Sequence, residues 1–262
     1  MEFEVYFDIL NYINLKIKFL QKKKLKWNNF GYWEVDPMPT EKELNKFYSE
    51  IYWLNNQYYK DKLLIPRDMS HLAFLEKVMN DKMNEDSVFM NFGAGHGGIS
   101  YLIAAKNMKV INIEPSFIFS GDFVKIKNFK YLDDFCKEEL KFSKIDIFYS
   151  SHTIEHLPNP EFFFKKIYNL LNKNGIIFIE VPNCRRLVID KNYAEGGCDG
   201  KITGSHLLYF TKDFFEKLNA KIYFFLEKDN STKFIQVDKE DNADLIRAVI
   251  TKESIKNWIS KL

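Results

Sequence analysis

The stretch VFMNFGAGHGG, residues 88–98, decides the fold, because it places four glycines directly after a short apolar run. Glycine permits the tight turn that such a loop needs and lets the backbone come close to a ligand. A helix that begins after the loop exposes unpaired backbone N–H groups at its N-terminus. The stretch therefore predicts a strand, a loop and a helix in succession, the arrangement that forms a nucleotide-type binding pocket.

The loop by itself leaves two kinds of cofactor open. Gly93, Gly95 and Gly98 satisfy the G-x-G-x-x-G pattern of dinucleotide-binding loops. Glu114 follows 114 − 93 = 21 positions after the first glycine, at the end of the next apolar run. Its carboxylate can accept both ribose hydroxyls of an adenosine, whether in a nicotinamide dinucleotide or in another adenosine cofactor.

Beyond the loop, short apolar runs alternate with helical patterns. This order is typical of a mostly parallel sheet with helices on both faces, so we expect a Rossmann-like α/β domain over residues 81–262. A polar, glycine-containing segment at about 183–205 is predicted to be a lid-like insertion. The apolar runs lie at residues 87–92, 109–114, 144–150, 175–181, 221–227 and 243–250, and the helical patterns at 98–107 and 160–174.

Residues 1–80 are predicted to form an N-terminal accessory or cap segment. Apolar residues alternate with polar ones at positions 3–9 and again at 13–19, which favours two short strands, although a helix also fits part of the pattern. Thr40 and Glu43 form a capping box for a helix that starts at about Glu41. A second helical pattern covers residues 70–79.

Charge and composition restrict the class of partner. Lys and Arg total 38 against 36 acidic residues, a balance that argues against a dedicated nucleic-acid binder and favours a small-molecule or protein partner. No apolar run is long enough to span a bilayer, and the N-terminus lacks the plan of a secretory signal, so we expect a cytoplasmic protein. Cys136, Cys184 and Cys198 have no C-x-x-C spacing, and we expect free thiols.

Four ordered motifs together resemble those of class I S-adenosylmethionine-dependent methyltransferases, of the group labelled methyltransferase 23. The loop at 88–98 resembles the first motif, NIEPS the acidic strand end that binds ribose, and residues 144–160 and 170–183 the fourth and fifth. With similar segments at 35–48 and 206–211, the resemblance covers roughly residues 30–220. It implies a seven-stranded sheet, S-adenosylmethionine as methyl donor and S-adenosylhomocysteine as product.

The resemblance also implies which residues bind the cofactor. Either Asp133 or Asp134 stands where the family meets the adenine amino group, after the apparent strand at 126–129. One departure concerns Asn91, because the first motif usually carries an aspartate there and the anchor of the loop is an amide here. The implied cofactor-binding residues are Phe92, Gly93, Ala94, Gly95, Glu114, Pro115, Asp133, Asp134 and Ser151.

His152, Glu155 and His156 spell H-x-x-E-H, the letter pattern of one class of zinc peptidase. Pro158 and Pro160 would break any helix that carried both imidazoles, so we expect a loop at the carboxyl end of a parallel strand. The loop also resembles that of some quinone-biosynthesis O-methyltransferases, which carry Glu-x-x-Glu-His there and are thought to bind a divalent cation. His, Glu and His would suit a transition metal better than magnesium. Of these alternatives we favour a site without a metal.

Transfer of a methyl group to a hydroxyl requires alignment of the two reacting atoms and removal of the hydroxyl proton. The candidate catalytic residues are His152, His206, His156 and Glu155. A histidine suits this task because its ordinary pKa lies near neutrality. We prefer His152 as the base, since it points elsewhere on the loop than His156, and His206 is the next candidate. A structural role for His156, hydrogen-bonded with Glu155, fits equally well.

Two arginines just after the fifth motif indicate the kind of acceptor. Arg185 and Arg186 stand side by side after Asn183, and planar guanidinium groups bind phosphate bidentately. We expect these three residues to contact a phosphate-bearing or nucleotide-linked sugar that is O-methylated, by analogy with relatives that act in bacterial capsule and surface-glycan biosynthesis. A surface pair of arginines without a substrate role fits the sequence equally well. An N-methyltransferase and a nicotinamide-dependent oxidoreductase remain alternatives.

Overall fold

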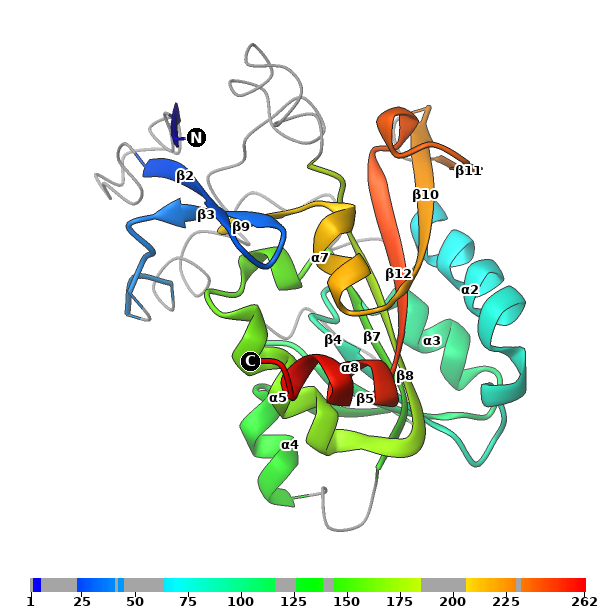
Figure 1. Ribbon diagram of the computed structural model, residues 1–262. Helices are drawn as coiled ribbons and strands as arrows, with labels where there is room; N and C mark the ends of the chain where they lie inside the picture. Colours follow the sequence, from blue (N-terminus) through cyan, green and yellow to red (C-terminus); the bar gives the residue numbers. More distant parts are fainter. Residues whose placement is uncertain are drawn as a thin grey trace, which may run out of the picture.

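The computed structural model describes residues 2–5, 23–40, 42–44, 64–115, 126–138, 144–184, 206–229 and 232–262. Within them, one large sheet carries helices on both faces, and a smaller sheet lies near the N-terminus (Figure 1). The predicted α/β fold with a mostly parallel sheet is therefore confirmed.

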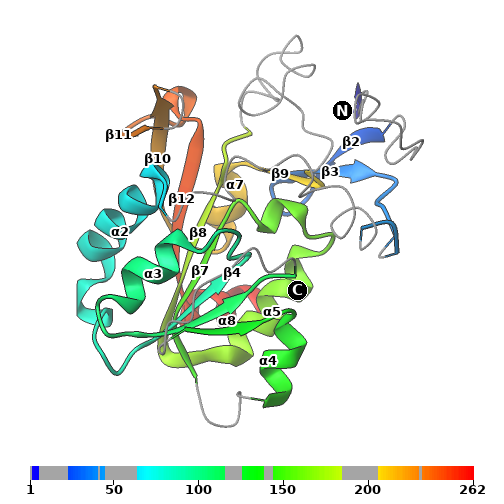
Figure 2. The ribbon, with the colours of Figure 1, turned by 180° about the vertical axis from the view of Figure 1, so that it is seen from behind.

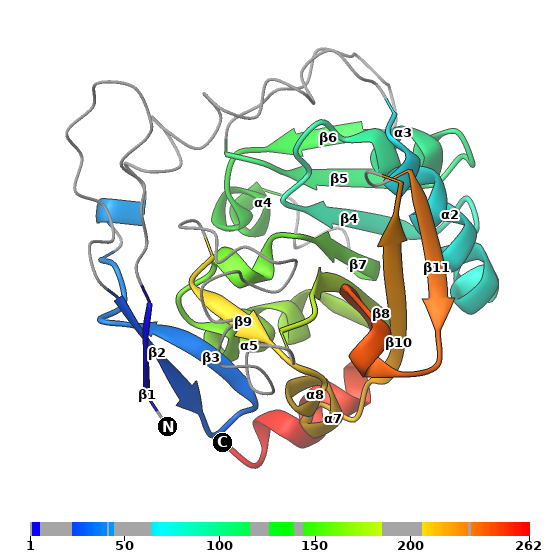
Figure 3. The same ribbon diagram turned by 90° about the horizontal axis from the view of Figure 1, so that it is seen from above.

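The large sheet has eight strands in the order β11-β10-β12-β8-β7-β4-β5-β6 (Figure 3). The five strands from β8 to β6 run parallel, while β12, β10 and β11 are added by antiparallel pairing. Along the chain the strands are Val88–Phe92 (β4), Lys109–Ile113 (β5), Ile126–Phe129 (β6), Ile145–Ser151 (β7), Leu171–Pro182 (β8), Lys221–Lys228 (β10), Lys233–Val237 (β11) and Leu245–Thr251 (β12).

The prediction of seven strands is wrong by one. The additional strand is β11, which forms an antiparallel hairpin with β10 at the edge of the sheet. Its sequence, KFIQV, is short and begins with a charged residue, so its apolar pattern is weak. Its strand conformation depends on antiparallel pairing with β10, which extends from Phe224 opposite Val237 to Lys228 opposite Lys233.

The two faces of the sheet are covered by different helices. Helices α2 (Pro66–Met79) and α3 (Gly98–Ala104) cover one face, as Figure 2 shows from behind. On the other face lie α4 (Leu132–Glu138), α5 (Pro160–Leu170), α7 (Lys212–Lys217) and α8 (Lys252–Ile259). Because side chains alternate along a strand, each strand contributes to both cores: Phe178 of β8 faces α2, and Ile179 faces α5.

The smaller sheet has the order β1-β2-β3-β9 and joins distant parts of the chain. Its strands are Glu2–Val5 (β1), Lys23–Asn28 (β2), Tyr32–Asp36 (β3) and Leu208–Phe210 (β9). Strand β3 pairs with β9, with Tyr32 opposite Phe210, so the N-terminal strands meet the segment that follows β8. The first predicted strand overlaps β1, and the second, at 13–19, lies outside the described residues.

Several smaller expectations also meet the structure. The capping box forms, because Glu43 accepts from the Thr40 backbone N–H at 2.8 Å and Thr40 Oγ1 accepts from the Glu43 N–H at 3.3 Å. The predicted helix at 70–79 lies within α2, whose Leu75 packs on the sheet, so this part of the expected accessory segment belongs to the main core. The division at residue 80 stays a prediction.

The lid-like insertion falls outside the described residues from 185 onward. Cys136 is free, as expected, whereas Cys184 is disulfide-bonded, which corrects the expectation of free thiols. Within the described ranges, no helix is long and apolar enough to cross a membrane.

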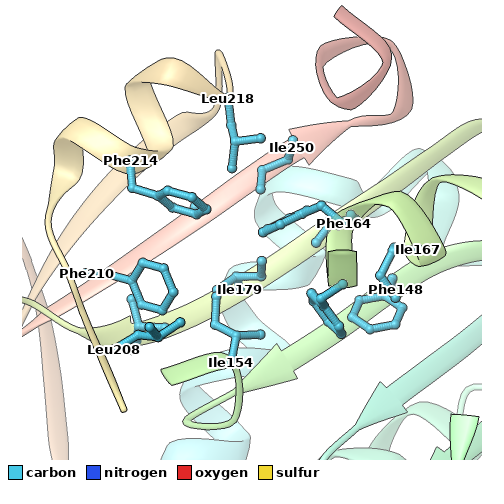
Figure 4. Packing of buried hydrophobic residues seen from close by; sticks show 14 of the residues in the cluster. Phe148, Ile154, Phe164, Ile167, Ile179, Leu208, Phe210, Phe214, Leu218 and Ile250 are labelled. Carbon is cyan, nitrogen blue, oxygen red and sulfur yellow. The ribbon is translucent and has the colours of Figure 1, made fainter. Parts of the chain in front are cut away.

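Aromatic and branched side chains fill the core between the sheet and helices α5, α7 and α8 (Figure 4). Helix α5 begins where the Asn159 side chain accepts from the Phe162 backbone N–H at 2.8 Å, with a proline at the first position. This start directs Phe164 into the core, beside Phe214 and Trp258. Phe162 lies two residues earlier on the same helix and points to solvent, with 57 % of its surface exposed.

This contrast gives a matched test of the core. We expect Phe164→Ala to lower the free energy of unfolding by about 3–5 kcal/mol, because the residue is fully buried and leaves a cavity. Phe162→Ala should change it by less than about 0.5 kcal/mol. Denaturant unfolding followed by circular dichroism measures both, and equal losses would contradict this packing.

Candidate active site

The carboxyl ends of the parallel strands bring the predicted site residues to one edge of the sheet. The chain passes from β4 outward to β5 and β6, and then returns to β7 on the other side of β4. In open α/β sheets, ligands bind at such a change of direction, outside the strand ends. The glycine loop, Glu114, the histidine loop and Asn183 all follow strands at this edge.

The glycine loop adopts the conformation that its sequence predicts. Gly93 and Gly95 have φ of 75° and 54°, in the left-handed region that favours glycine. The Gly95 N–H donates to Glu114 Oε2 at 2.8 Å, and the Gly93 N–H donates to the Ile113 carbonyl at 2.9 Å. The loop is thereby held against the end of β5, next to the carboxylate that was predicted to bind ribose.

The glycine loop also touches the histidine loop. A Cβ atom at Gly93 would overlap the Thr153 side chain, so no larger residue fits there. Thr153 in turn donates its hydroxyl to the Ser151 carbonyl at 3.0 Å. The two loops that were predicted to hold the cofactor and the base are therefore packed against each other.

Asn91 begins a chain of buried polar side chains under the glycine loop. Its Nδ2 donates to Ser100 Oγ at 2.9 Å, Ser100 donates to Asn112 Oδ1 at 2.6 Å, and Asn112 donates to Asn128 at 3.0 Å. The chain links β4, helix α3, β5 and β6. The amide that replaces the usual aspartate thus anchors the loop through the start of α3.

The other predicted cofactor residues lie in different environments. Phe92 is half-buried against the rings of Phe148 and Phe163, at centroid distances of 5.8 and 5.1 Å. Asp133, on α4, is exposed and forms an ion pair with Lys166 at 2.8 Å. Ala94 is buried and Pro115 is exposed, while Asp134 is intermediate.

The histidine loop is short and is not a sustained helix. Strand β7 ends at Ser151, His152 takes a positive φ of 49°, and only Ile154–His156 form a single 3₁₀ turn. The rejection of a peptidase-type helix agrees with this geometry. His152 Nδ1 lies 3.5 Å from Glu155 Oε1, and its Nε2 lies 3.4 Å from Glu180 Oε1. The ring of His152 therefore sits between two carboxyl groups.

His206 comes from a different segment and completes a second group of side chains. The Leu207 backbone N–H donates to the Glu155 carbonyl at 2.8 Å, which ties the start of β9 to the histidine loop. The rings of His206 and His156 meet edge to face at 4.9 Å between centroids. One ligand atom from each of Glu155, His156 and His206 lies within 4.8 Å of the others.

Glu180 was not identified from the sequence; it is a carboxylate near the end of β8 that is 0 % exposed and contacts several residues of this site. Its Oε2 lies 2.7 Å from Arg247 Nε and 2.7 Å from His71 Nε2. Its Oε1 accepts from the Ser151 hydroxyl at 3.1 Å and lies near His152 and, at 3.7 Å, Arg67.

The partners of Glu180 are themselves held by the surrounding core. His71 Nδ1 lies 2.6 Å from the Tyr149 hydroxyl, and Arg247 lies over the Phe225 ring at 3.9 Å. Strands β8 and β12 place Glu180 directly opposite Arg247. Arg67 and His71 stand four residues apart on α2, on one helix face.

The two buried glutamates differ in their proton affinity. Burial alone would raise the pKa of Glu180, but the neighbouring charges of His71 and Arg247 hold this pKa well below its ordinary value. Glu155 has no such partner, and burial raises its pKa to about 8. Burial, with Arg67 nearby, lowers the pKa of His152 to about 4, so the expectation of a pKa near neutrality is wrong.

One signal in the sequence could have found this network. Glu180 lies within the apolar run GIIFIEV, and Arg247 lies within LIRAVI, the apolar part of ADLIRAVI; both runs were predicted to be strands. A charged residue in such a strand must be paired. The sequence does not state the partner, because the two residues are 67 positions apart.

The expected acceptor residues are only partly described. Asn183 is buried, and its Nδ2 donates to the carbonyls of Glu240 and Ala243 at 3.0 Å each. Its amide therefore holds the end of β8 to the turn before β12, and we leave it out of the acceptor site. Arg185 and Arg186 lie outside the described residues.

Comparison with known proteins identifies the class. Residues 69–228 match the family model described as a methyltransferase domain, which is more than half of the 262 residues. The chain therefore belongs to this methyltransferase family. Two expectations are thereby confirmed: the protein is an enzyme of this kind, and its cofactor is S-adenosylmethionine. No curated protein matches the chain.

Two solved structures are similar to the chain. A SAM-dependent methyltransferase from Anabaena variabilis ATCC 29413 matches with a TM-score of 0.51 and 13% identity, over 74% of this chain and 92% of that chain. Another, from Archaeoglobus fulgidus, has a TM-score of 0.49 and 17% identity, over 77% of this chain and 100% of that chain. At such identities the Anabaena likeness supports the fold alone.

The buried charge network makes a sharp prediction for stability. We expect Glu180→Gln to lower the free energy of unfolding by about 3–5 kcal/mol near pH 7, because Arg247 would be left as an uncompensated buried charge. Glu253→Gln on α8 removes an exposed acid and should change it by less than about 0.5 kcal/mol. Denaturant titration compares the two, and equal effects would contradict the assigned role.

Proposed function

We propose that the protein transfers the methyl group of S-adenosylmethionine to an oxygen atom of a small polar acceptor. One observation carries the proposal: the glycine loop closes on Glu114 and packs directly against the loop that bears His152. This arrangement would bring the cofactor and a proton acceptor to the same edge of the sheet.

The described residues fit an adenosine cofactor. Glu114 is buried, and its carboxylate accepts from the Gly95 backbone N–H within the glycine loop. Its two oxygens would bind the ribose hydroxyls, and the Gly93–Gly95 turn would leave room for the backbone to approach the ligand. Phe92 and Ala94 would flank this pocket. S-adenosylmethionine supplies an activated methyl group, so the protein has to align it and manage a proton.

His152 is the proposed proton acceptor. Its imidazole is neutral at pH 7 and can accept a proton, while its low pKa makes it a weaker base than an ordinary histidine. The imidazolium that forms would lie between Glu180, held ionised by Arg247, and Glu155. A nearby negative charge stabilises an imidazolium and fixes the ring orientation.

The acceptor class rests on sequence alone. Arg185 and Arg186 follow the end of β8, which is the strand that carries Glu180, and they would provide bidentate contacts to phosphate. We therefore retain a phosphate-bearing or nucleotide-linked sugar of bacterial surface-glycan biosynthesis as the proposed acceptor, with a cytoplasmic site of action.

Calorimetric titration with S-adenosylhomocysteine and, separately, with NAD tests the cofactor pocket. We expect binding of the former only, and Glu114→Ala should weaken it about tenfold or more, because a hydrogen-bonding charge is lost. Glu85→Ala removes an exposed acid outside the pocket and is the control. Binding of NAD alone would replace the proposal with an oxidoreductase.

Release of S-adenosylhomocysteine in the presence of nucleotide-linked sugars, sugar phosphates and amines tests the acceptor. We expect turnover with the phosphorylated sugars, and His152→Ala should lower kcat roughly 10²–10⁴-fold. Changing Arg185 and Arg186 to alanine together should raise the KM for the acceptor and leave S-adenosylhomocysteine binding intact. An unchanged KM, or turnover with amines alone, would contradict the acceptor assignment.

A further inference from the structure

Glu155 is a buried carboxylate with no hydrogen-bond donor in the described part of the chain. It is 1% exposed, and both carboxylate oxygens are buried without a hydrogen-bond partner. Leaving such a group unsatisfied costs about 1–3 kcal/mol, and more if the group is charged. Its backbone is nevertheless well anchored, because its carbonyl accepts from Leu207 N–H and the preceding Ile154 is fully buried. The side chain is therefore held in place without a hydrogen-bond partner for its oxygens among the described residues, and the His152 ring is near Oε1 at 3.5 Å.

Two imidazoles from separate segments face the same carboxylate. His206 Nε2 lies 3.9 Å from Glu155 Oε1, and His156 offers a nitrogen within 4.8 Å of the other two ligand atoms. His206 keeps 16% of its side-chain surface exposed, so an ion could reach the group from solvent. Local spacing alone would have joined His152 to Glu155 and His156, but the fold supplies His206 instead.

We propose that Glu155, His156 and His206 bind a divalent transition metal ion beside His152. Two imidazoles and one carboxylate favour ions such as Zn²⁺ or Co²⁺ over Mg²⁺, which prefers oxygen ligands. Metal–ligand bonds of about 2 Å place neighbouring donors roughly 3–3.5 Å apart. The three donors have to close by about an ångström, which side-chain rotation can supply.

The ion would satisfy the Glu155 carboxylate and leave open positions for a further ligand, because three protein donors do not fill its coordination sphere. The acceptor oxygen could bind at such a position, and the ion would then help to orient the acceptor. This catalytic consequence rests on the proposed methyl transfer, whereas binding of the ion does not.

The test is a titration of chelator-treated, desalted protein with Co²⁺, followed by visible absorption. We expect one ion per chain, with d–d bands that one equivalent of Zn²⁺ abolishes. His206→Ala and Glu155→Gln should each weaken Co²⁺ binding at least about tenfold. His96→Ala removes another partly exposed histidine, one that contacts Asp68 outside this group, and should leave binding unchanged.

Calorimetry with S-adenosylhomocysteine on the same samples separates the possible outcomes. A variant that binds S-adenosylhomocysteine like the parent but has lost Co²⁺ supports the site, since it is folded. Absence of stoichiometric Co²⁺ bands in the parent would overturn the proposal, as would equal affinity in His206→Ala or an equal loss in His96→Ala. Co²⁺ binding without S-adenosylhomocysteine binding would keep the metal site and remove the proposed function.

Discussion

The pairing of one buried carboxylate, Glu180, is the constraint on which the rest of the structure depends. A fully buried charge is stable only when its partners are also buried and well placed. Arg247 meets it across the β8–β12 pair, His71 reaches it from α2, and His152 approaches it from the end of β7. One side chain therefore fixes how a helix, two neighbouring strands and the histidine loop sit relative to one another.

The same arrangement places two glutamates with different proton affinities beside His152. His152 stands between two glutamates of opposite character, because Glu180 has a guanidinium partner and Glu155 does not. Burial acts on both, yet the pKa of Glu180 is held low and that of Glu155 is raised to about 8. Contact between Gly93 and Thr153 then couples this group to the loop that would hold the cofactor.

Much of the fold was accessible from local patterns. Local sequence patterns predicted the strands of the large sheet apart from β11, which is short and carries charge, but they did not predict β9 of the smaller sheet. The Thr40–Glu43 capping box was predicted directly from the spacing of the two residues. The prolines after His156 correctly excluded a long zinc-binding helix. The site was less accessible: Glu180, His71 and Arg247 were missed, and Asn183 proved to hold backbone carbonyls.

By itself, the sequence determined the strand, loop, helix and strand from β4 to β5, the glycine turn and the acidic residue after β5, because these depend on neighbours within a few positions along the chain. Only the tertiary structure decided which charged and titratable side chains lie in contact with one another. His206 meets Glu155 through the pairing of β3 with β9 and the anchoring of Leu207, and Arg247 meets Glu180 through strand register. Electrostatic energy depends on distance through space and on burial, and neither can be read from the spacing of letters.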